Sequence, residues 1–486
     1  MSMGSALSNA LSGLNAVSRA AGVVSSNVSN AMTEGYSRRD IELSSQNLGR
    51  FGAGVTVVGI ARHTDPVTTG ERRIADGEVA LAQSRTGFLD GFAHAMGQAD
   101  EAGSITGQIV SLEKSLIEAA SRPESESRLQ SVLYSAQNLA EKINSAADSL
   151  MSSRMTADKD IGNTVDLLQS SLQQVVDLNV AIQQSVSSGY DSNSLLDQRQ
   201  QVIDKISKII PVKEISRENQ AVSLYSPGGA ILIDSKAATI EFTPVATITP
   251  DMTVVSGILS GLTINGQAVS TNADKGAIAG GSLAGLFEVR DQLIPSAQVK
   301  LDAVARDLIE RFQTTDVDPT LGIAAAGLFT DSGTILDPLN EEALANRLSV
   351  NALIDPDQSG DLWKIRDGLG AVIEGEQGDS TLLIAMTEAL QKSRVVVSGD
   401  FTTVERSAAN LSADFYSLVE GDLLNLETGM SFSAARQESL KTIELEAGVD
   451  TDFEMQQLIL IEQSYAANAK VIQTIDTLLN QLIGML

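Results

Sequence analysis

Apolar residues recur at alternating intervals of three and four positions at both ends of the 486-residue chain. This spacing is typical of a coiled-coil helix, in which the a and d positions form one continuous stripe. We therefore predict amphipathic helices over residues 1–35 and 451–486 that pack against each other and against neighbouring copies. The N-terminal stripe consists of Leu7, Leu11, Leu14, Val17, Ala21, Val24 and Val28. The C-terminal stripe consists of Leu458, Ile461, Tyr465, Asn468, Ile472, Ile475, Leu479, Leu482 and Leu486.

Local signals indicate where these two helices begin and end. Gly35 is a candidate stop for the first helix, because glycine tolerates the backbone conformation that often ends a helix. Thr451 and Glu454 form a capping-box pattern, in which each side chain would accept a hydrogen bond from the other residue's backbone amide. No Gly or Pro occurs over residues 449–483, so we expect one long helix there.

Residues 75–210 also have mostly helical periodicity, with breaks expected near Pro123, Gly189 and Pro211. In the second half of this region, the stripe positions are spaced alternately four and three residues apart. Its positions are Ile161, Val165, Leu168, Leu172, Val175, Asn179, Ile182 and Val186.

The pattern changes at Val212 and stays different to about Gly276. Short β-branched runs, such as residues 230–233 and 253–255, are separated by glycine-containing turns, which predicts a small β-rich module. Helical periodicity resumes over residues 283–312, and a loop-rich mixed region covers roughly 316–380. Helical periodicity then returns from Leu382 to the end of the chain.

These segments predict an α+β, multi-domain and mainly α protein. Residues 1–65 with 431–486 are expected to form a terminal coiled-coil domain, and residues 66–210 with 277–430 a long helical-bundle domain. Residues 211–276 are expected to form an inserted, β-rich outer domain. All ten prolines lie between Pro66 and Pro356, which leaves both ends free of the strongest helix breaker.

Composition narrows the possible partners. The 62 acidic and 34 basic residues leave a formal charge of −28, and such a surface repels nucleic acid and anionic lipid. No stretch reaches the roughly 18 apolar residues of a membrane span. The first 28 residues lack the unbroken apolar run of a secretory signal. We therefore expect a soluble protein that binds neither nucleic acid nor membrane.

Catalytic and metal-binding patterns are absent from the sequence. The chain has no cysteine, and His63 and His94 begin no zinc motif and stand beside no plausible nucleophile. The run from Asp355 resembles half of a calcium loop, but Arg366 stands where a bidentate Glu is required. We therefore expect no enzyme activity, no cofactor and no metal site.

The stripes at the two ends favour assembly over an ordinary core. The first helix is rich in Ser, Asn and Gly, and Gly13 and Gly22 each cost roughly 1 kcal/mol relative to Ala. Such a helix is marginal alone and would fold when neighbours bury its stripe. Asn468 either selects the register through a buried hydrogen bond or lies at the edge of the stripe.

Several motifs, in order along most of the chain, resemble the axial proteins of the bacterial flagellum, and most closely the hook-associated protein 1 family. The stretch 26–39 resembles the family's N-terminal signature, and residues 54–65, 195–199, 280–292 and 448–472 match later motifs. Two departures are Glu34, where proline is usual, and a β-rich middle that is short. The signature positions are Asn27, Asn30, Gly35, Tyr36, Ser37 and Arg38.

The resemblance implies a structural protein that joins hook to filament. It implies a ring of identical copies whose terminal helices line an inner tube, held between the hook protein and the second junction protein. It also implies export in unfolded form through the flagellar type III apparatus to an extracellular location, with a chaperone on the C-terminal helix. The alternatives are a hook or rod protein of the same apparatus, and a secreted adhesin or enzyme with helical ends.

Overall fold

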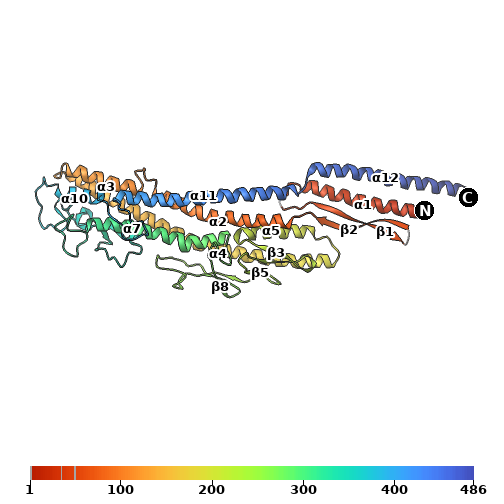
Figure 1. The fold of residues 1–486 in the computed structure, drawn as a ribbon, viewed down its shortest axis with the longest axis horizontal. Coiled ribbons are helices and arrows are strands. Elements are labelled where there is room, and N and C mark those ends of the chain that lie inside the picture. Colours follow the sequence, from red (N-terminus) through yellow and green to blue (C-terminus); the bar gives the residue numbers. More distant parts are fainter. Residues whose placement is uncertain (1–2, 34, 49–50, 486) are drawn as a thin grey trace.

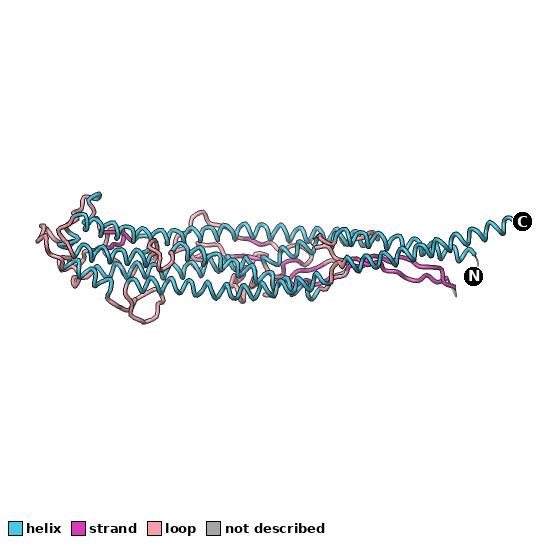
Figure 2. Tube along the Cα trace, turned by 90° about the horizontal axis from the view of Figure 1, so that it is seen from above, coloured by secondary structure: helices cyan, strands magenta, loops and turns pink. Residues whose placement is uncertain are grey.

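The chain is a long rod in which both termini lie at the same narrow end (Figure 1). The computed structural model describes residues 3–33, 35–48 and 51–485. More than half of these residues lie in helices, and the irregular loops gather at the end opposite the termini (Figure 2). The fold is therefore mainly α with small separate sheets, as the periodicity predicts.

The narrow end, which we call the terminal segment, contains two helices and a hairpin. Helix α1 (Met3–Asn30) lies beside α12 (Thr451–Gly484). Strands β1 (Arg39–Leu48) and β2 (Phe51–Arg62) form an antiparallel hairpin that runs along α1. Helix α1 ends at Asn30, so the prediction that it continues to Gly35 was wrong. Glu34 and Leu486 lie outside the described residues.

The rest of the chain forms the body, which is built on long helices. Their breaks fall near Pro123, Gly189 and Pro211, as predicted, because proline and glycine interrupt helices there. The stripe from Ile161 to Ile182 is buried along its length on the longest of them. These helices are α2 (Pro66–Met96), α3 (Ile105–Ala120), α4 (Glu126–Ser187) and α5 (Asn193–Ile209).

Two three-stranded antiparallel sheets follow, within the region expected to be β-rich. Asn265 and Gly266 form a tight turn with positive φ between β7 and β8, as their sequence predicts. Residues 253–255 form turns, so the strand predicted there was wrong: Val255 is 99% exposed and has no sheet to join. The strands are β3 (Lys213–Ser216), β4 (Val222–Tyr225), β5 (Ile231–Ile233), β6 (Ile240–Glu241), β7 (Leu262–Ile264) and β8 (Gln267–Val269), with 3₁₀ turn η1 (Glu218–Gln220).

The chain then returns to the helical body. Helices α6 (Ser282–Glu288) and α7 (Ile294–Phe312) are joined by a π-helical turn, Val289–Leu293, within the predicted helical span. Helix α10 (Thr381–Gln391) is followed by irregular residues 392–407, so the expectation of helix throughout from Leu382 was wrong. Helix α11 (Ala408–Glu446) packs along α2 and leads back to the terminal segment. The elements between α7 and α10 are β9 (Phe329–Asp331), α8 (Leu344–Arg347), β10 (Leu348–Val350), η3 (Ala352–Ile354), η4 (Pro356–Gln358) and α9 (Lys364–Asp367).

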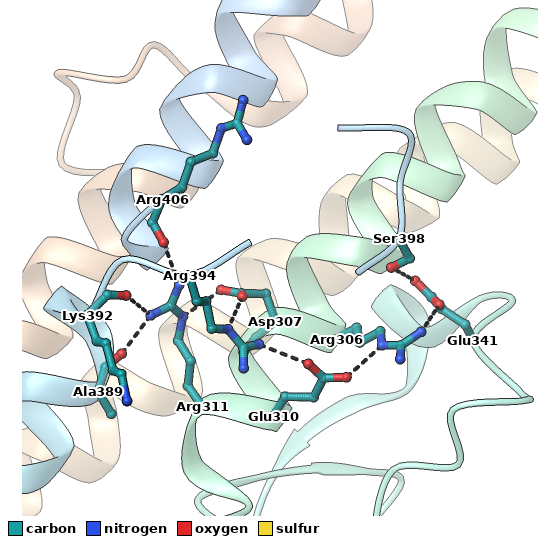
Figure 3. Close-up of polar contacts among 10 residues, drawn as sticks. All are labelled: Arg306, Asp307, Glu310, Arg311, Glu341, Ala389, Lys392, Arg394, Ser398 and Arg406. Atoms are coloured by element: carbon teal, nitrogen blue, oxygen red, sulfur yellow. Dashed lines mark hydrogen bonds and ion pairs between the residues drawn. The ribbon is translucent and has the colours of Figure 1, made fainter. Parts of the chain in front are cut away.

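A buried arginine explains how the irregular residues 392–407 are held. Arg311 on α7 pairs with Asp307 at 2.6 Å and donates to the carbonyl oxygens of Ala389, Lys392 and Arg406 (Figure 3). The last carbonyl groups of a helix have no partner within that helix. Arg311 therefore closes the end of α10 and ties the following loop to α7.

Candidate assembly surface

The two terminal helices lie side by side but cover little of each other. Of the 34 residues of α12, only Glu454 and Ile475 are buried among those described. On α1 the buried residues are Ala10, Ala16, Val23, Val24 and Asn27. A pair of helices with so small a core has much of its apolar surface in contact with water.

The residues predicted to form the stripes fall into three classes of exposure. Val24 and Ile475 are buried. The half-buried residues are Leu14, Val17, Ala21, Ile461, Asn468 and Ile472. The rest are 37–52% exposed: Leu7, Leu11, Val28, Leu458, Tyr465, Leu479 and Leu482. Most of the stripe is thus only partly covered within one chain.

A second set of apolar side chains on α12 was missed by the sequence argument. These residues lie outside the heptad stripe and are between 41% and 68% exposed. They widen the apolar face of α12 beyond what α1 alone can cover. A count of apolar residues outside the a and d positions would have found them. They are Phe453, Ile459, Leu460, Val471, Leu478 and Ile483.

Gly13 is the point of close approach between the two helices. A Cβ at this position would lie 2.9 Å from Oδ1 of Asn468. Asn468 donates through Nδ2 to the carbonyl oxygen of Ser464 in its own helix, at 3.0 Å. Among the described residues it makes no hydrogen bond to α1. Its contact with Gly13 is therefore steric, and a hydrogen bond across the pair is not formed.

The β1–β2 hairpin is attached to α1 through Ser12. The hydroxyl of Ser12 accepts from the backbone amide of Val55 at 3.2 Å and donates to the carbonyl of Asn9 at 2.9 Å. Gly54 has a φ of +100°, and a Cβ there would lie 2.0 Å from the Ser12 hydroxyl. Glycine is thus required both by the backbone and by the close contact. The sequence argument did not predict β1, although the alternation of Ile41 and Leu43 with polar residues could have indicated it.

The signature residues lie where the terminal segment meets the body. Asn27 is fully buried, and its side chain makes two hydrogen bonds to the backbone of Arg39. Nδ2 donates to the Arg39 carbonyl oxygen at 2.8 Å, and Oδ1 accepts from the Arg39 amide at 3.1 Å. The hydroxyl of Tyr36 donates to the same side chain at 2.9 Å. Asn30 donates to the Ser26 carbonyl at the last turn of α1. Gly35 has a φ of +77°. Together these residues turn the chain from α1 into β1.

Charged side chains then connect this turn to distant parts of the chain. Arg38 donates to Glu454 on α12 at 2.8 Å, and its guanidinium lies over the ring of Phe453. Arg39 and Arg62 both pair with Asp197 on α5, at 2.8 and 2.7 Å. The Ser37 hydroxyl accepts a hydrogen bond from Arg62 (2.9 Å). The basic residues therefore fix the hairpin between α12 and α5.

The capping box predicted at Thr451 and Glu454 was wrong. The N-cap is Asp450, whose carboxylate accepts from the amides of Asp452 and Phe453 at 2.9 and 3.2 Å. Glu454 is 1% exposed and bonds to Arg38 in place of the helix end. A contact with a residue 416 positions away thus overrides the local pattern.

A second charged cluster holds the end of α11 against the body. Arg72 on α2 contacts Asp76, Asp204 and Glu444, and the hydroxyl of Thr69 donates to Glu444 at 2.8 Å. Burial alone would lower the pKa of Arg72, but these three carboxylates raise it above its ordinary value. These contacts therefore fix the C-terminal end of α11 against α2, just before the chain enters α12.

The described residues contain no group of three or more His, Cys, Asp or Glu side chains arranged to hold a metal ion. His63 contacts Asp40 at 2.6 Å and is half-exposed, and His94 lies near Asp90 at the surface. Among the helices of residues 3–33, 35–48 and 51–485, none is long and apolar enough to cross a membrane. The site is thus a packing surface with a charged joint.

Comparisons with known proteins match this chain along nearly all of its length. The model of the flagellar hook-associated protein FlgK helical domain matches residues 94–318, and that of the flagellar basal body rod FlgEFG protein C-terminal region matches residues 446–485. Flagellar hook-associated protein 1 of Salmonella typhimurium is 22% identical over 99% of this chain and 100% of its own length. The Bacillus subtilis protein of that name is 21% identical over 98% of this chain and 97% of its own.

A solved structure is also similar to part of this chain. It is the flagellar hook junction protein FlgK from Burkholderia pseudomallei, at 20% identity and a TM-score of 0.44, covering 54% of this chain and 47% of that one. The Salmonella alignment runs over 564 positions. Because this chain has 486 residues, the alignment includes positions at which this sequence has a gap.

Proposed function

We propose that the chain is a member of the flagellar hook-associated protein 1 family and a structural subunit of the hook–filament junction. In this role it forms a ring of identical copies by packing its terminal segments together. The similarity to flagellar hook-associated protein 1 and to the rod-protein C-terminal region supports a place in the flagellum, among other rod and hook components. The neighbours we propose are the hook protein on one side and the second junction protein on the other.

The observation that carries this proposal is the uncovered apolar surface of α1 and α12. Monomeric proteins rarely leave large contiguous apolar patches in water, and such patches commonly mark protein interfaces. Here the patch runs along both helices, from Leu7 and Leu11 on α1 to Leu458 and Leu482 on α12. Packing against neighbouring copies would remove it from water.

The assembly residues we propose act by packing and by setting register. Those on the stripe are Leu7, Leu11, Leu14, Val24, Val28, Leu458, Ile461, Tyr465, Asn468, Ile472, Ile475, Leu479 and Leu482. The signature residues Asn27, Asn30, Gly35, Tyr36, Ser37 and Arg38 position the terminal segment on the body. None of these residues is proposed to be catalytic.

We also propose how the subunit reaches its place. A terminal segment with so little internal core has a low cost of unfolding, which suits export through the flagellar type III apparatus to the outside of the cell. A chaperone on α12 would cover the same apolar side chains before export. Three domains are proposed: residues 1–65 with 431–486, residues 66–210 with 277–430, and residues 211–276, although α11 runs without a break across position 430.

Two other functions are less well supported. A hook or rod protein would share the C-terminal match over 446–485, but the match over 94–318 is to the helical domain of the hook-associated protein. An adhesin or enzyme would require a ligand surface or a catalytic group, and the apolar terminal helices provide neither. The junction function accounts for both the body and the ends.

The test is to replace exposed apolar residues of α12 in cells that express the protein from its own locus. We expect Leu460→Gln combined with Leu478→Gln to reduce the number of filaments held on hooks, because both side chains are about half-exposed in the free subunit. Val255→Gln is the matched control, since Val255 is 99% exposed in the β-rich region. Filaments in normal number with the double variant would reject the proposal.

A further inference from the structure

A cavity of about 310 Å³ opens on the side of the body, away from the terminal segment. Its walls come from α4, from α7, from the residues just before α8 and from the loop that contains Ser398. Met151, Pro250, Pro295 and Val299 supply an apolar wall. The cavity is also lined by three carboxylate side chains, which make this part of its wall polar and negative: Asp302, Glu341 and Glu342.

Asp302 is a buried carboxylate that makes no ion pair among the described residues, although Arg347 lies near enough to interact with its charge. Its side chain is 3% exposed and accepts from the Gln298 side chain at 2.8 Å and from the amides of Ala343 and Ala345 at 2.9 and 2.8 Å. Burial raises the pKa of Asp302 to about 6, although these hydrogen bonds oppose the shift. A positive charge placed nearby would stabilise the carboxylate.

Gln298 supplies an unused hydrogen-bond acceptor at the same place. The residue is 4% exposed, lines the cavity and donates through Nε2 to Asp302. Its oxygen, Oε1, is buried and has no hydrogen-bond partner. A buried acceptor without a partner costs free energy of folding, and a donor that enters the cavity could satisfy it.

The remaining charges leave the cavity negative. Glu341 accepts from Arg306 and from the hydroxyl of Ser398 (Figure 3). Glu342 forms no ion pair among the described residues. Arg154 is the one cation on the described wall, and its guanidinium donates to the carbonyl oxygens of Arg290, Thr249, Pro250 and Met252. The hydrogen-bond donors of Arg154 are therefore used by backbone carbonyl groups; its charge interacts with Glu342 at a distance, without an ion pair between them.

From this arrangement we propose that the cavity binds an alkylammonium group, a protonated primary amine on a short apolar stem. The stem packs against Met151, Pro295 and Val299. An ammonium group has three donors, so it can serve Asp302, Glu342 and the Gln298 oxygen together. Its source is either a lysine side chain of a neighbouring copy or a free small amine.

The test uses the full-length chain labelled with ¹³C at its methionine methyl groups. Met151 lies in the apolar wall, and its signal is assigned by comparison with Met151→Leu. Adding n-butylammonium at pH 7.5 is expected to shift this signal saturably and to leave that of Met455, on α12, unchanged. n-Butanol at equal concentration is expected to produce no saturable shift, because it carries no charge.

Two matched variants separate charge from simple packing. Glu342→Gln is expected to weaken butylammonium binding about threefold, the effect of losing one partly exposed ion pair. Glu376→Gln, an exposed carboxylate outside the cavity, is expected to bind as the wild type does. An unmoved Met151 signal, an equal shift with butanol, or wild-type binding by Glu342→Gln would each overturn the proposal.

The same signal identifies the source of the amine. Unlabelled chain is added to the labelled chain in place of butylammonium. If the Met151 signal shifts in both titrations, the ligand is a lysine of a neighbouring copy. If it shifts with butylammonium alone, the ligand is a free small amine. Either result supports the alkylammonium site.

Discussion

Helices α4 and α12 have the same spacing of apolar positions, but the stripe of α4 is buried and that of α12 is mostly exposed. In α4, 21 of the 62 residues are buried, and Leu168, Leu172 and Val175 are fully covered by the body. In α12, two of the 34 residues are buried, and most of its stripe is open to water. A heptad stripe thus specifies a packing face without specifying whether its partner lies in the same chain. The partners of the α4 stripe lie in the same chain, whereas α1 covers only part of the α12 stripe.

The charged residues differ between the two regions in the same way. In the body, Asp158 and Arg290 form an ion pair at 2.7 Å with both side chains fully buried. At the joint of the terminal segment, Arg38 is 16% exposed and Glu454 1%. The joint therefore holds the terminal segment in place while its apolar helices remain accessible.

The largest expected effect comes from truncating equivalent leucines in the two helices. Leu172→Ala should lower the free energy of unfolding by about 2–5 kcal/mol, because it leaves a cavity in a closed core. Leu479→Ala should cost less than about 1 kcal/mol in the free subunit, since Leu479 is 40% exposed. Urea unfolding followed by circular dichroism measures both. Equal losses would show that α12 is packed as tightly as α4.

An intermediate effect is expected at the joint. Glu454→Gln removes the charge that Arg38 contacts, and a hydrogen bond to a charged group is worth about 1.5–3 kcal/mol. Hydrogen exchange should quicken in β1, β2 and the first turns of α12, while α4 keeps its protection. Glu462→Gln, on the exposed side of α12, is the control. Faster exchange throughout the body would mean that the joint also stabilises the core.

The smallest effect is expected at the helix caps. Asp450→Ala removes the N-cap of α12, at a cost of about 1 kcal/mol, and should speed exchange of the Asp452 and Phe453 amides about fivefold. Ser104→Ala removes the matching cap of α3, which accepts from Gly107 at 2.9 Å. Helix α3 packs against α4, so its first turn should fray less. Stronger fraying of α3 would contradict the contrast between the two regions.

Several parts of the fold could be predicted because they depend on neighbouring residues. Breaks near Pro123, Gly189 and Pro211 follow from the backbone limits of proline and glycine. The Asn265-Gly266 turn follows from the positive φ that these residues tolerate. The run at 253–255 shows the limit of this reasoning, because β-branched residues form a strand only where another strand is available to pair.

For the candidate assembly surface, the sequence predicted the residues of the heptad stripe. It did not predict how far the exposed apolar surface extends beyond that stripe. Leu458 and Tyr465 could be placed on one face of a helix by spacing alone. Leu460 and Leu478 lie outside that spacing, and their importance depends on how little α1 covers. The joint was recognisable as a motif at Tyr36, Ser37 and Arg38, but its partners Asp197 and Glu454 were not identifiable as such.

By itself, the sequence determined the helices, most of their breaks and the stripes they present. These properties depend on residues three or four positions apart, whose side chains must lie on the same face of a helix. The tertiary structure decided which stripes are covered, where the hairpin lies and what the signature residues bind. Those outcomes depend on pairs such as Arg38 and Glu454, separated by 416 positions and joined only when the whole chain has folded.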